Sequence, residues 1–255
     1  ADVMELDISD FIAVKKYFSE VKPDLVINCA AYTNVDGCES NEDTAFRINA
    51  LGPRNLALAS EEIGAKLIHV STDYVFNGEG SVPFREYDLP QPVSVYGKTK
   101  LSGENYVREL SSRYFIVRTA WLYGYEGKNF VYTIMRVGKE KGVLTVVDDQ
   151  RGNPTNAEDL AHHLLKLGVT EEFGTYHCTG KGECSWFDFA SKIIELSGIQ
   201  CTVKPVTSAE YESAARRPAF SSLDNMMLRC TVGDEMRQWE EALRMFIPKI
   251  DASSV

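Results

Sequence analysis

The chain has 255 residues, of which 44% are hydrophobic and 25% are charged, as expected for a globular protein with one large core or two lobes. Its net charge of −10 argues against general binding of nucleic acid or of anionic membranes, because both need a basic surface. The six cysteines show no Cys-x-x-Cys spacing and no apolar run is long enough to span a membrane, so we expect reduced thiols in a cytoplasmic protein without a metal site.

Apolar residues recur at helical spacing from Phe11 to Val21, and Pro23 ends this pattern before a short apolar run, Leu25 to Cys29. Helical and strand patterns then alternate along the chain. The expected helices are 42–63 (with a kink at Gly52-Pro53), 96–110, 129–141, 157–167, 184–197 and 234–246, and the expected strands are 66–70, 114–118, 143–147, 175–178 and 201–206. Alternating strands and helices imply right-handed crossovers, so we predict an α/β fold with a doubly wound, Rossmann-like parallel sheet.

Tyr96 and Lys100 are four residues apart near the start of an expected helix, so both side chains fall on one face. A phenol has a pKa of about 10. A nearby ammonium group would stabilise its ionised form and make it a usable acid or base at neutral pH. Taken alone, the pair favours an ordinary exposed helix, because this spacing is common by chance. The sequence around the pair favours a catalytic interpretation.

In a doubly wound sheet, ligands bind beyond the carboxyl ends of the strands, so the residues that follow each apolar run are candidates for a site. Ala30 and Ala31 would let a flat cofactor lie against the backbone, and close helix packing explains them equally well. The hydroxyl groups of Ser71 and Thr72 could polarise a carbonyl group or cap the strand end. Trp121 follows the third apolar run.

Three motifs in this order and spacing resemble the extended short-chain dehydrogenase/reductases: Asn28 to Ala31, Ser71 to Phe76, and Tyr96 to Lys100. Within that superfamily the sequence is most similar to the dTDP-4-dehydrorhamnose reductases. Further similar stretches are 118–123, 129–130, 149–155 and 217–218, with Ser221 and Leu223. The resemblance extends from Leu6 to about Phe246, which is nearly the whole chain.

The resemblance implies that Tyr96 donates a proton and that Lys100 holds both the phenol and the nicotinamide ribose. Thr72 would hydrogen-bond the reacting sugar oxygen. Further substrate contacts would come from Asp73, Tyr74, Trp121, Asn129 and Arg217. NADPH or NADH would be contacted by Asp7, Ile8, Ala31, Tyr32, Thr33, Tyr96 and Lys100. The implied reaction is hydride transfer to C4 of a dTDP-sugar, dTDP-4-dehydro-L-rhamnose, in dTDP-rhamnose biosynthesis.

Several alternatives remain at this point. Asn129 is equally suited to cap its helix, and Arg217 with Arg216 could clamp a diphosphate or form a solvated loop. Tyr74 stands where related 4,6-dehydratases have a glutamate, which disfavours dehydration. A nucleotide-sugar 4-epimerase uses the same tyrosine and lysine, but the epimerases usually carry small residues in place of Asp73 and Tyr74. A non-catalytic nucleotide-sugar or regulatory binding protein of the same fold is a further alternative, which the retained Tyr96 disfavours.

The chain departs from its relatives at the amino terminus. A dinucleotide-binding domain normally opens with a strand, a glycine-rich turn and a helix whose N–H groups hold the pyrophosphate, and no such turn occurs here. We expect that one βαβ unit of about 30 residues precedes Ala1 in the relatives, and we favour an incomplete sequence over a sheet repaired by another chain or a shortened relative. The neighbours of a missing strand would need other partners for their backbone groups.

Two lobes are predicted. Residues 1–127 and 152–180 would form the dinucleotide-binding domain, and residues 128–151 and 181–255 the substrate-binding lobe. A homodimer is a possible assembly. Among the histidines, His69 is expected in the core, His177 lies in a strand without an obvious partner, and one of His162 and His163 must face outward.

Overall fold

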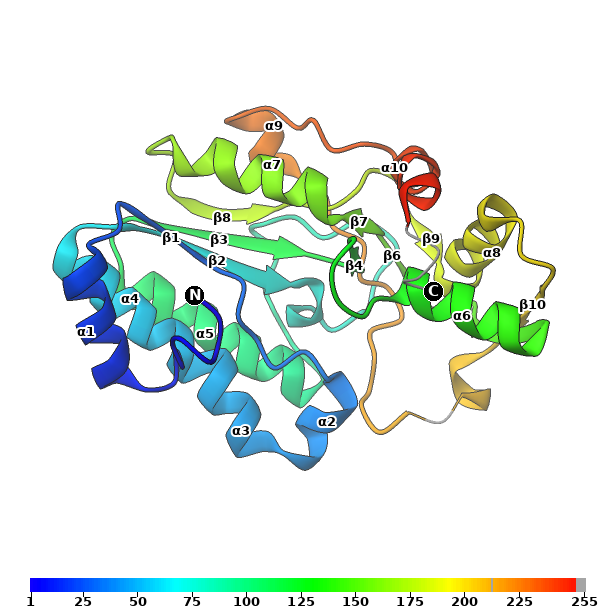
Figure 1. Ribbon diagram of the computed structural model, residues 1–255, viewed down its shortest axis with the longest axis horizontal. Coiled ribbons are helices and arrows are strands. Elements are labelled where there is room, and N and C mark those ends of the chain that lie inside the picture. The colour runs from blue at the N-terminus through cyan, green and yellow to red at the C-terminus, as the bar shows by residue number, and fades with distance from the viewer. Residues whose placement is uncertain (212, 251–255) are drawn as a thin grey trace.

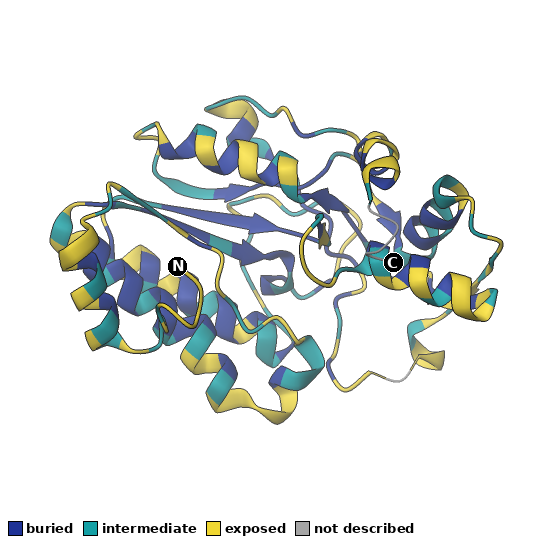
Figure 2. Ribbon diagram, in the orientation of Figure 1, coloured by how far each residue is buried: buried dark blue, intermediate teal, exposed yellow. Residues whose placement is uncertain are grey.

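Four parallel strands form the central sheet, in the order β1-β2-β3-β8 (Figure 1). They are β1 (Leu25–Asn28), β2 (Lys66–Thr72), β3 (Tyr114–Thr119) and β8 (Gly174–His177). The computed structural model describes residues 1–211 and 213–250. Within that part of the chain β1 pairs with β2 alone, and its Ile27 is 38% exposed. The two middle strands are almost entirely buried, as expected of a parallel sheet that is covered on both faces (Figure 2).

Helices cover both faces of this sheet, which confirms the doubly wound α/β prediction (Figure 1). One face is covered by α1 (Phe11–Val21), α4 (Gly52–Ile63) and α5 (Val95–Leu110), and the other by α7 (Ala157–Gly168) and α9 (Met226–Cys230). Neighbouring strand residues alternate between these layers. Leu67 and Ile116 pack with α1 and α4, whereas Ile68 and Phe115 pack with α7.

The helix predicted for 42–63 is in fact two helices joined by a wide turn. α3 (Glu42–Phe46) is followed by a π-helical turn, Arg47–Leu51, and then by α4. The irregularity in the helical path is this π-helical turn, which precedes Gly52-Pro53, and Pro53 itself is well accommodated in the first turn of α4. Single π-turns of this kind are frequent at functional sites. The short helix α2 (Val35–Ser40), capped by Asn34, was not predicted.

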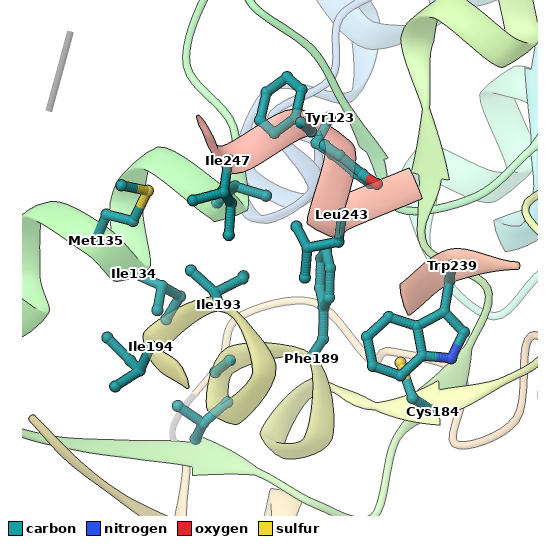
Figure 3. Packing of buried hydrophobic residues seen from close by; sticks show 14 of the residues in the cluster. Tyr123, Ile134, Met135, Cys184, Phe189, Ile193, Ile194, Trp239, Leu243 and Ile247 are labelled. Carbon is teal, nitrogen blue, oxygen red and sulfur yellow. The ribbon is translucent and has the colours of Figure 1, made fainter. Parts of the chain in front are cut away.

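A second cluster of elements lies beside the carboxyl ends of the strands. It contains α6 (Phe130–Lys141), α8 (Trp186–Ser197), α10 (Trp239–Phe246) and a parallel pair of strands, β5 (Val143–Val147) and β10 (Thr202–Val206). Buried side chains from these helices form one core, in which Phe189, Ile193 and Leu243 lie together (Figure 3). The other strands are short: β4 (Leu122–Tyr123) pairs with β7 (Thr155–Asn156), and β6 (Arg151–Gly152) with β9 (Cys184–Ser185).

Two predicted helix starts in this region were wrong. The segment 184–197 begins as β9 and becomes helical only at Trp186, because Ser185 and Asp188 form a capping box there. The last helix begins at Trp239 instead of residue 234, since Asp234 binds the backbone N–H of Met236 in a turn. No helix in the described residues is long and apolar enough to cross a bilayer.

Candidate active site

Thr72 and Tyr96 meet where β2 ends and α5 begins. Thr72 is the last residue of β2 and lies opposite Thr119 of β3 in the register of the sheet. Ser94 caps α5 by accepting a hydrogen bond from the backbone N–H of Gly97 (3.1 Å). A Cβ atom at Gly97 would collide with the carbonyl oxygen of Tyr74, so glycine allows the helix to approach the turn that follows β2. The aromatic rings of Tyr74 and Tyr96 consequently pack edge to face, with centroids 5.5 Å apart.

Lys100 lies one turn further along α5 and is 2% exposed. Its Nζ donates a hydrogen bond to the carbonyl oxygen of Val70 in β2 (2.7 Å). Burial lowers the pKa of Lys100 to about 8, and the negative charge of Glu104 opposes this shift. No other acceptor for the ammonium group is found among the described residues. Two of its three N–H bonds therefore remain available to a ligand.

The phenol of Tyr96 is kept protonated by its surroundings. Burial raises its pKa well above the ordinary value, and the neighbouring Thr72 hydroxyl opposes this only in part. Lys100 was expected to lower this pKa, but burial dominates and the net shift is upward; the Lys100 ammonium group is hydrogen-bonded to the Val70 carbonyl oxygen. A protonated phenol is nevertheless suited to act as a proton donor.

Asp73 and Tyr74 follow Thr72 in the chain and lie beside this pair. The Thr72 hydroxyl donates to Oδ1 of Asp73 (3.0 Å) and also accepts from the backbone N–H of Tyr74 (3.2 Å), so its strand-end cap is confirmed. Burial raises the pKa of Asp73 to about 6, against hydrogen bonds from Ser221 and Thr72 that lower it. Burial also raises the pKa of Tyr74 to about 12, against the nearby charge of Arg217.

Arg217 joins this group from a distant part of the chain. Its Nη1 donates to the hydroxyl of Tyr74 (3.3 Å), and its Nη2 donates to Asp36 at the start of α2 (3.0 Å). The other oxygen of Asp36 accepts from the Ser213 hydroxyl and from the backbone N–H of Ala215, each at 3.0 Å. Asp36 was not identified from the sequence, although its carboxylate binds three residues of the segment 213–217.

A buried ion pair lies behind Lys100. Arg118 of β3 donates to both carboxylate oxygens of Glu104 of α5 (2.9 and 2.7 Å), and Ser71 donates to the same carboxylate (2.6 Å). His177, for which no partner was predicted, accepts from Arg118 (3.3 Å) and donates to the carbonyl of Phe84 (3.0 Å). Burial and the charge of Arg118 lower the pKa of His177 to about 3, so this histidine is neutral. His69 is buried in β2, as predicted, and His162 is the outward member of its pair.

The predicted dinucleotide contacts lie along the ends of β1 and α4. The buried Asn49, in the π-helical turn, accepts from the backbone N–H of Tyr32 (2.8 Å) and donates to the Tyr32 carbonyl (3.1 Å) and to Thr99 of α5 (3.2 Å). It thereby fixes the loop that contains Ala31 and Thr33 relative to the helix of Lys100. Ile8 packs on Gly52, and Asp7 accepts from the backbone N–H of Ser9 in an adjacent turn. Asn49 was missed because its bonds are made to distant residues.

A cavity of about 770 Å³ extends from Arg217 into the second cluster. Phe130, Gln150, Trp186 and Arg216 contribute to its wall. The capping role of Asn129 is confirmed, since its side chain accepts from the backbone N–H of Tyr132 (3.1 Å) and begins α6. Its amide nitrogen donates to the Gly124 carbonyl (2.8 Å). In the part of the chain that the structure describes, no cluster of three or more His, Cys, Asp or Glu side chains is arranged to hold a metal ion.

Comparisons with known proteins place the chain in a family. The family model described as "RmlD substrate binding domain" matches residues 1–252. The spore coat polysaccharide biosynthesis protein SpsK of Bacillus subtilis is 42% identical over 95% of this chain and 85% of its own length. The dTDP-4-dehydrorhamnose reductase of Streptomyces griseus is 41% identical over 96% of this chain and 83% of its own length.

Solved structures show the same similarity. A dTDP-4-dehydrorhamnose reductase from Clostridium acetobutylicum has a TM-score of 0.96 and 51% identity, over 97% of this chain and 88% of that one. A second, from Bacillus anthracis in complex with NADP, has a TM-score of 0.96 and 44% identity, over 98% and 89% of the two chains. A UDP-glucose 4-epimerase from Thermotoga maritima, with a TM-score of 0.79 and 22% identity, shares the fold.

Proposed function

The chain belongs to the family described as the RmlD substrate binding domain, and from this premise we propose that it is a dTDP-4-dehydrorhamnose reductase. It reduces the C4 ketone of dTDP-4-dehydro-L-rhamnose to the alcohol of dTDP-L-rhamnose, with NADPH or NADH as reductant, in dTDP-rhamnose biosynthesis. Reductases of this name are 41% and 51% identical to the chain. The single observation that carries the proposal is that Thr72 and Tyr96 lie together at the carboxyl end of β2, with the Lys100 ammonium group one helical turn further on and bonded to the same strand.

The residues present fit the nicotinamide half of a dinucleotide. The buried Lys100 ammonium has N–H bonds to spare, and the neighbouring Ala30 is exposed at the end of β1, where a flat ring could lie against it. We assign the contacts to Asp7, Ile8, Ala31, Tyr32, Thr33, Tyr96 and Lys100. The related structure in complex with NADP supports the choice of cofactor. When bound, the dinucleotide supplies the hydride.

Tyr96 delivers the proton that the reduced carbonyl oxygen needs. Its raised pKa keeps the phenol protonated throughout the neutral range, and an alkoxide is a far stronger base than a phenolate. The Thr72 hydroxyl lies beside the phenol; its one proton is donated to Asp73 in this structure, and turning that proton to the substrate would orient the same oxygen. Positioned proton transfer of this kind contributes about 10²–10⁴-fold to the rate. Lys100 stabilises the negative charge left on Tyr96.

The remaining substrate contacts surround this centre. Asp73, Tyr74 and Trp121 lie at the sugar, and Arg217 with Asn129 approaches the diphosphate. The position of Arg217 supports this assignment of residues to the sugar and to the diphosphate. Its side chain contacts Tyr74 and also lines the 770 Å³ cavity, whose aromatic walls are suited to a nucleoside. We further propose that residues 1–127 and 152–180 act as the dinucleotide-binding domain and 128–151 and 181–255 as the substrate lobe. The cytoplasmic location and a homodimeric assembly remain predictions.

The proposal is tested by mixing the protein with dTDP-4-dehydro-L-rhamnose and following nicotinamide absorbance with NADPH and with NADH. We expect oxidation of at least one of them, with dTDP-L-rhamnose as the product. The Tyr96→Phe variant, assayed in parallel, should bind the sugar nucleotide but oxidise the nicotinamide far more slowly. Binding of substrate without oxidation of either nicotinamide would indicate a non-catalytic binding protein. Conversion of added dTDP-L-rhamnose to its C4 epimer, with no net change in nicotinamide absorbance, would indicate an epimerase.

A further inference from the structure

Trp121 has a backbone conformation that is uncommon for a bulky residue. Its φ is 48°, in the left-handed region. Among the described residues, Lys22 is the other non-glycine residue with a positive φ, and it simply ends α1. Large side chains remain in this region only where the surrounding structure holds them, and such positions concentrate at binding sites. The neighbours of Trp121 should therefore show what holds it.

Gly152 of β6 and Trp186, the first residue of α8, fix the indole ring. Trp186 stacks on Trp121 with ring centroids 3.5 Å apart and planes 7° from parallel. Gly152 permits the ring to approach the backbone, since a Cβ atom there would lie 2.7 Å from both Cε2 and Nε1 of the indole. Gly152 pairs with Cys184 in the antiparallel register, and Trp186 follows two residues later. The antiparallel β6–β9 pairing thus places Gly152 near the start of α8, where Trp186 lies.

The position of Trp121 links the two parts of the site. β3 ends at Thr119, directly opposite Thr72, and Trp121 comes two residues beyond that end. On its other side, Trp186 lines the cavity that begins at Arg217. Trp121 thus follows the strand end that faces Thr72, and its indole stacks on a residue of the cavity wall. A sugar ring joined to a nucleoside diphosphate would have to cross this position.

We propose that Gly152 and Trp186 are positioning residues, which hold Trp121 in its left-handed conformation as a rigid wall for the sugar of the nucleotide-sugar. This inference rests on the proposed function for the identity of the ligand. Neither positioning residue needs to touch the sugar. A preorganised indole favours binding of the sugar because no further ordering of the side chain is required.

The first test is spectroscopic and needs no turnover. The chain has three tryptophans, and two parallel indoles at 3.5 Å should produce an exciton couplet in the far-ultraviolet circular dichroism spectrum. We expect the couplet in the wild type and in Trp239→Phe, because Trp239 packs edge to face on Phe189. It should disappear in Trp186→Phe. Absence from the wild type, or loss in Trp239→Phe alone, would overturn the assignment.

The second test separates the sugar from the nucleotide. Gly152→Ala should weaken binding of dTDP-L-rhamnose about three- to tenfold, the range expected for one aromatic contact, and change the affinity for dTDP less than about twofold. The matched control is Gly138→Ala in α6, where the one close contact of the added Cβ atom is the flexible end of Ile194 and the Cys201 atoms lie at an ordinary 3.6 Å. This control should bind both ligands as the wild type does.

Equal losses for dTDP and dTDP-L-rhamnose in Gly152→Ala would mean a general structural role and would overturn the proposal, as would no loss at all. If Gly152→Ala does not fold, Trp186→Ala and Trp186→Phe provide the same comparison, and the phenylalanine should restore most of the preference for the sugar. An inactive wild type that still prefers dTDP-L-rhamnose over dTDP would defeat the proposed reduction but not this inference. A wild type without that preference would defeat the inference itself.

Discussion

Tyr96 illustrates how a single residue is adapted to one direction of a reaction. Burial raises the pKa of its phenol, the Thr72 hydroxyl lies beside it, and the Lys100 ammonium is held on the Val70 carbonyl one turn away. A phenol in this environment retains its proton until a stronger base forms next to it. This property suits reduction of a ketone, in which an alkoxide is the species to be protonated.

We predict that Tyr96→Phe lowers kcat by about 10²–10⁴-fold and leaves the KM for the sugar nucleotide nearly unchanged, because only the transferable proton is removed. Steady-state kinetics measure both constants. Tyr106→Phe, on the same helix and away from the sheet end, is the control and should retain normal turnover. A rate near that of the wild type in Tyr96→Phe would exclude Tyr96 as the proton donor.

Asp73 permits a prediction about stability and pH. Its folded pKa of about 6 lies above the ordinary 3.8, so ionisation of this buried carboxyl group destabilises the native state as the pH rises through that interval. Replacing it with asparagine removes the ionisation. Relative to the wild type, Asp73→Asn should therefore gain up to about 3 kcal/mol between about pH 4 and pH 7, since each pKa unit corresponds to about 1.4 kcal/mol.

Urea unfolding of both proteins across this pH range measures the difference, because all other titrating groups are common to the two chains. A difference that does not vary with pH would show that the carboxyl group has an ordinary pKa. Asp73→Asn should also lower kcat, since Asp73 orients the Thr72 hydroxyl.

Among the elements, α5 combines the catalytic and the structural roles. Its first turns contain Tyr96 and Lys100, and its next turn contains Glu104, which is fully buried and held by Arg118 and Ser71 of the adjacent strands. The helix is thus anchored to β2 and β3 by charge as well as by packing. Because Glu104 faces the same strands as Lys100, the anchor also fixes the height of the ammonium group along the sheet.

We predict that Glu104→Gln destabilises the protein by about 3–5 kcal/mol, because Arg118 is left buried without a counter-charge. Urea or thermal unfolding measures this loss. Glu140→Gln is the control: it removes a carboxylate from the exposed Arg136–Glu140 pair and should cost less than about 1 kcal/mol. A similar small effect of both substitutions would mean that Arg118 finds another partner and that α5 does not depend on the pair.

On the scale of the whole molecule, the two clusters of elements are connected across the site by a few polar contacts. Asp36 of α2 binds Arg217, Ser213 and Ala215, which are 177 or more residues away in the chain. The same Arg217 reaches Tyr74 at the sheet end. The position of this arginine therefore depends on both parts of the molecule at once.

We predict that Asp36→Asn raises the KM for the sugar nucleotide about three- to tenfold, the equivalent of about 1 kcal/mol of lost positioning, with a smaller change in the KM for the nicotinamide. The stability cost should stay below about 1 kcal/mol, since the ion pair is partly exposed. Kinetics with each substrate varied in turn provide the measurement, and Asp43→Asn on the neighbouring α3 is the control. Equal increases in both KM values would contradict a specific role for Arg217.

Much of the local structure was predictable because its causes are local. Helical periodicity between Phe11 and Val21 gave the correct bounds of α1, and the apolar runs before Asn28 and Thr72 became parallel strands. The four-residue spacing of Tyr96 and Lys100, with Thr72 at a strand end, also predicted which side chains would lie together. Periodicity and spacing indicate which face of an element is buried, and they depend only on residues that are close together in the sequence.

What the amino-acid sequence determined by itself was therefore the order of elements, the α/β class and the set of side chains at the end of the sheet. Only the tertiary structure decided the partners of His177, the bonds of Asn49, the bridge from Asp36 to Arg217 and the direction of the pKa shift at Tyr96. Each of these depends on residues far apart in the chain or on exclusion of water. Burial and long-range contact exist only once the chain has folded, so no local pattern contains them.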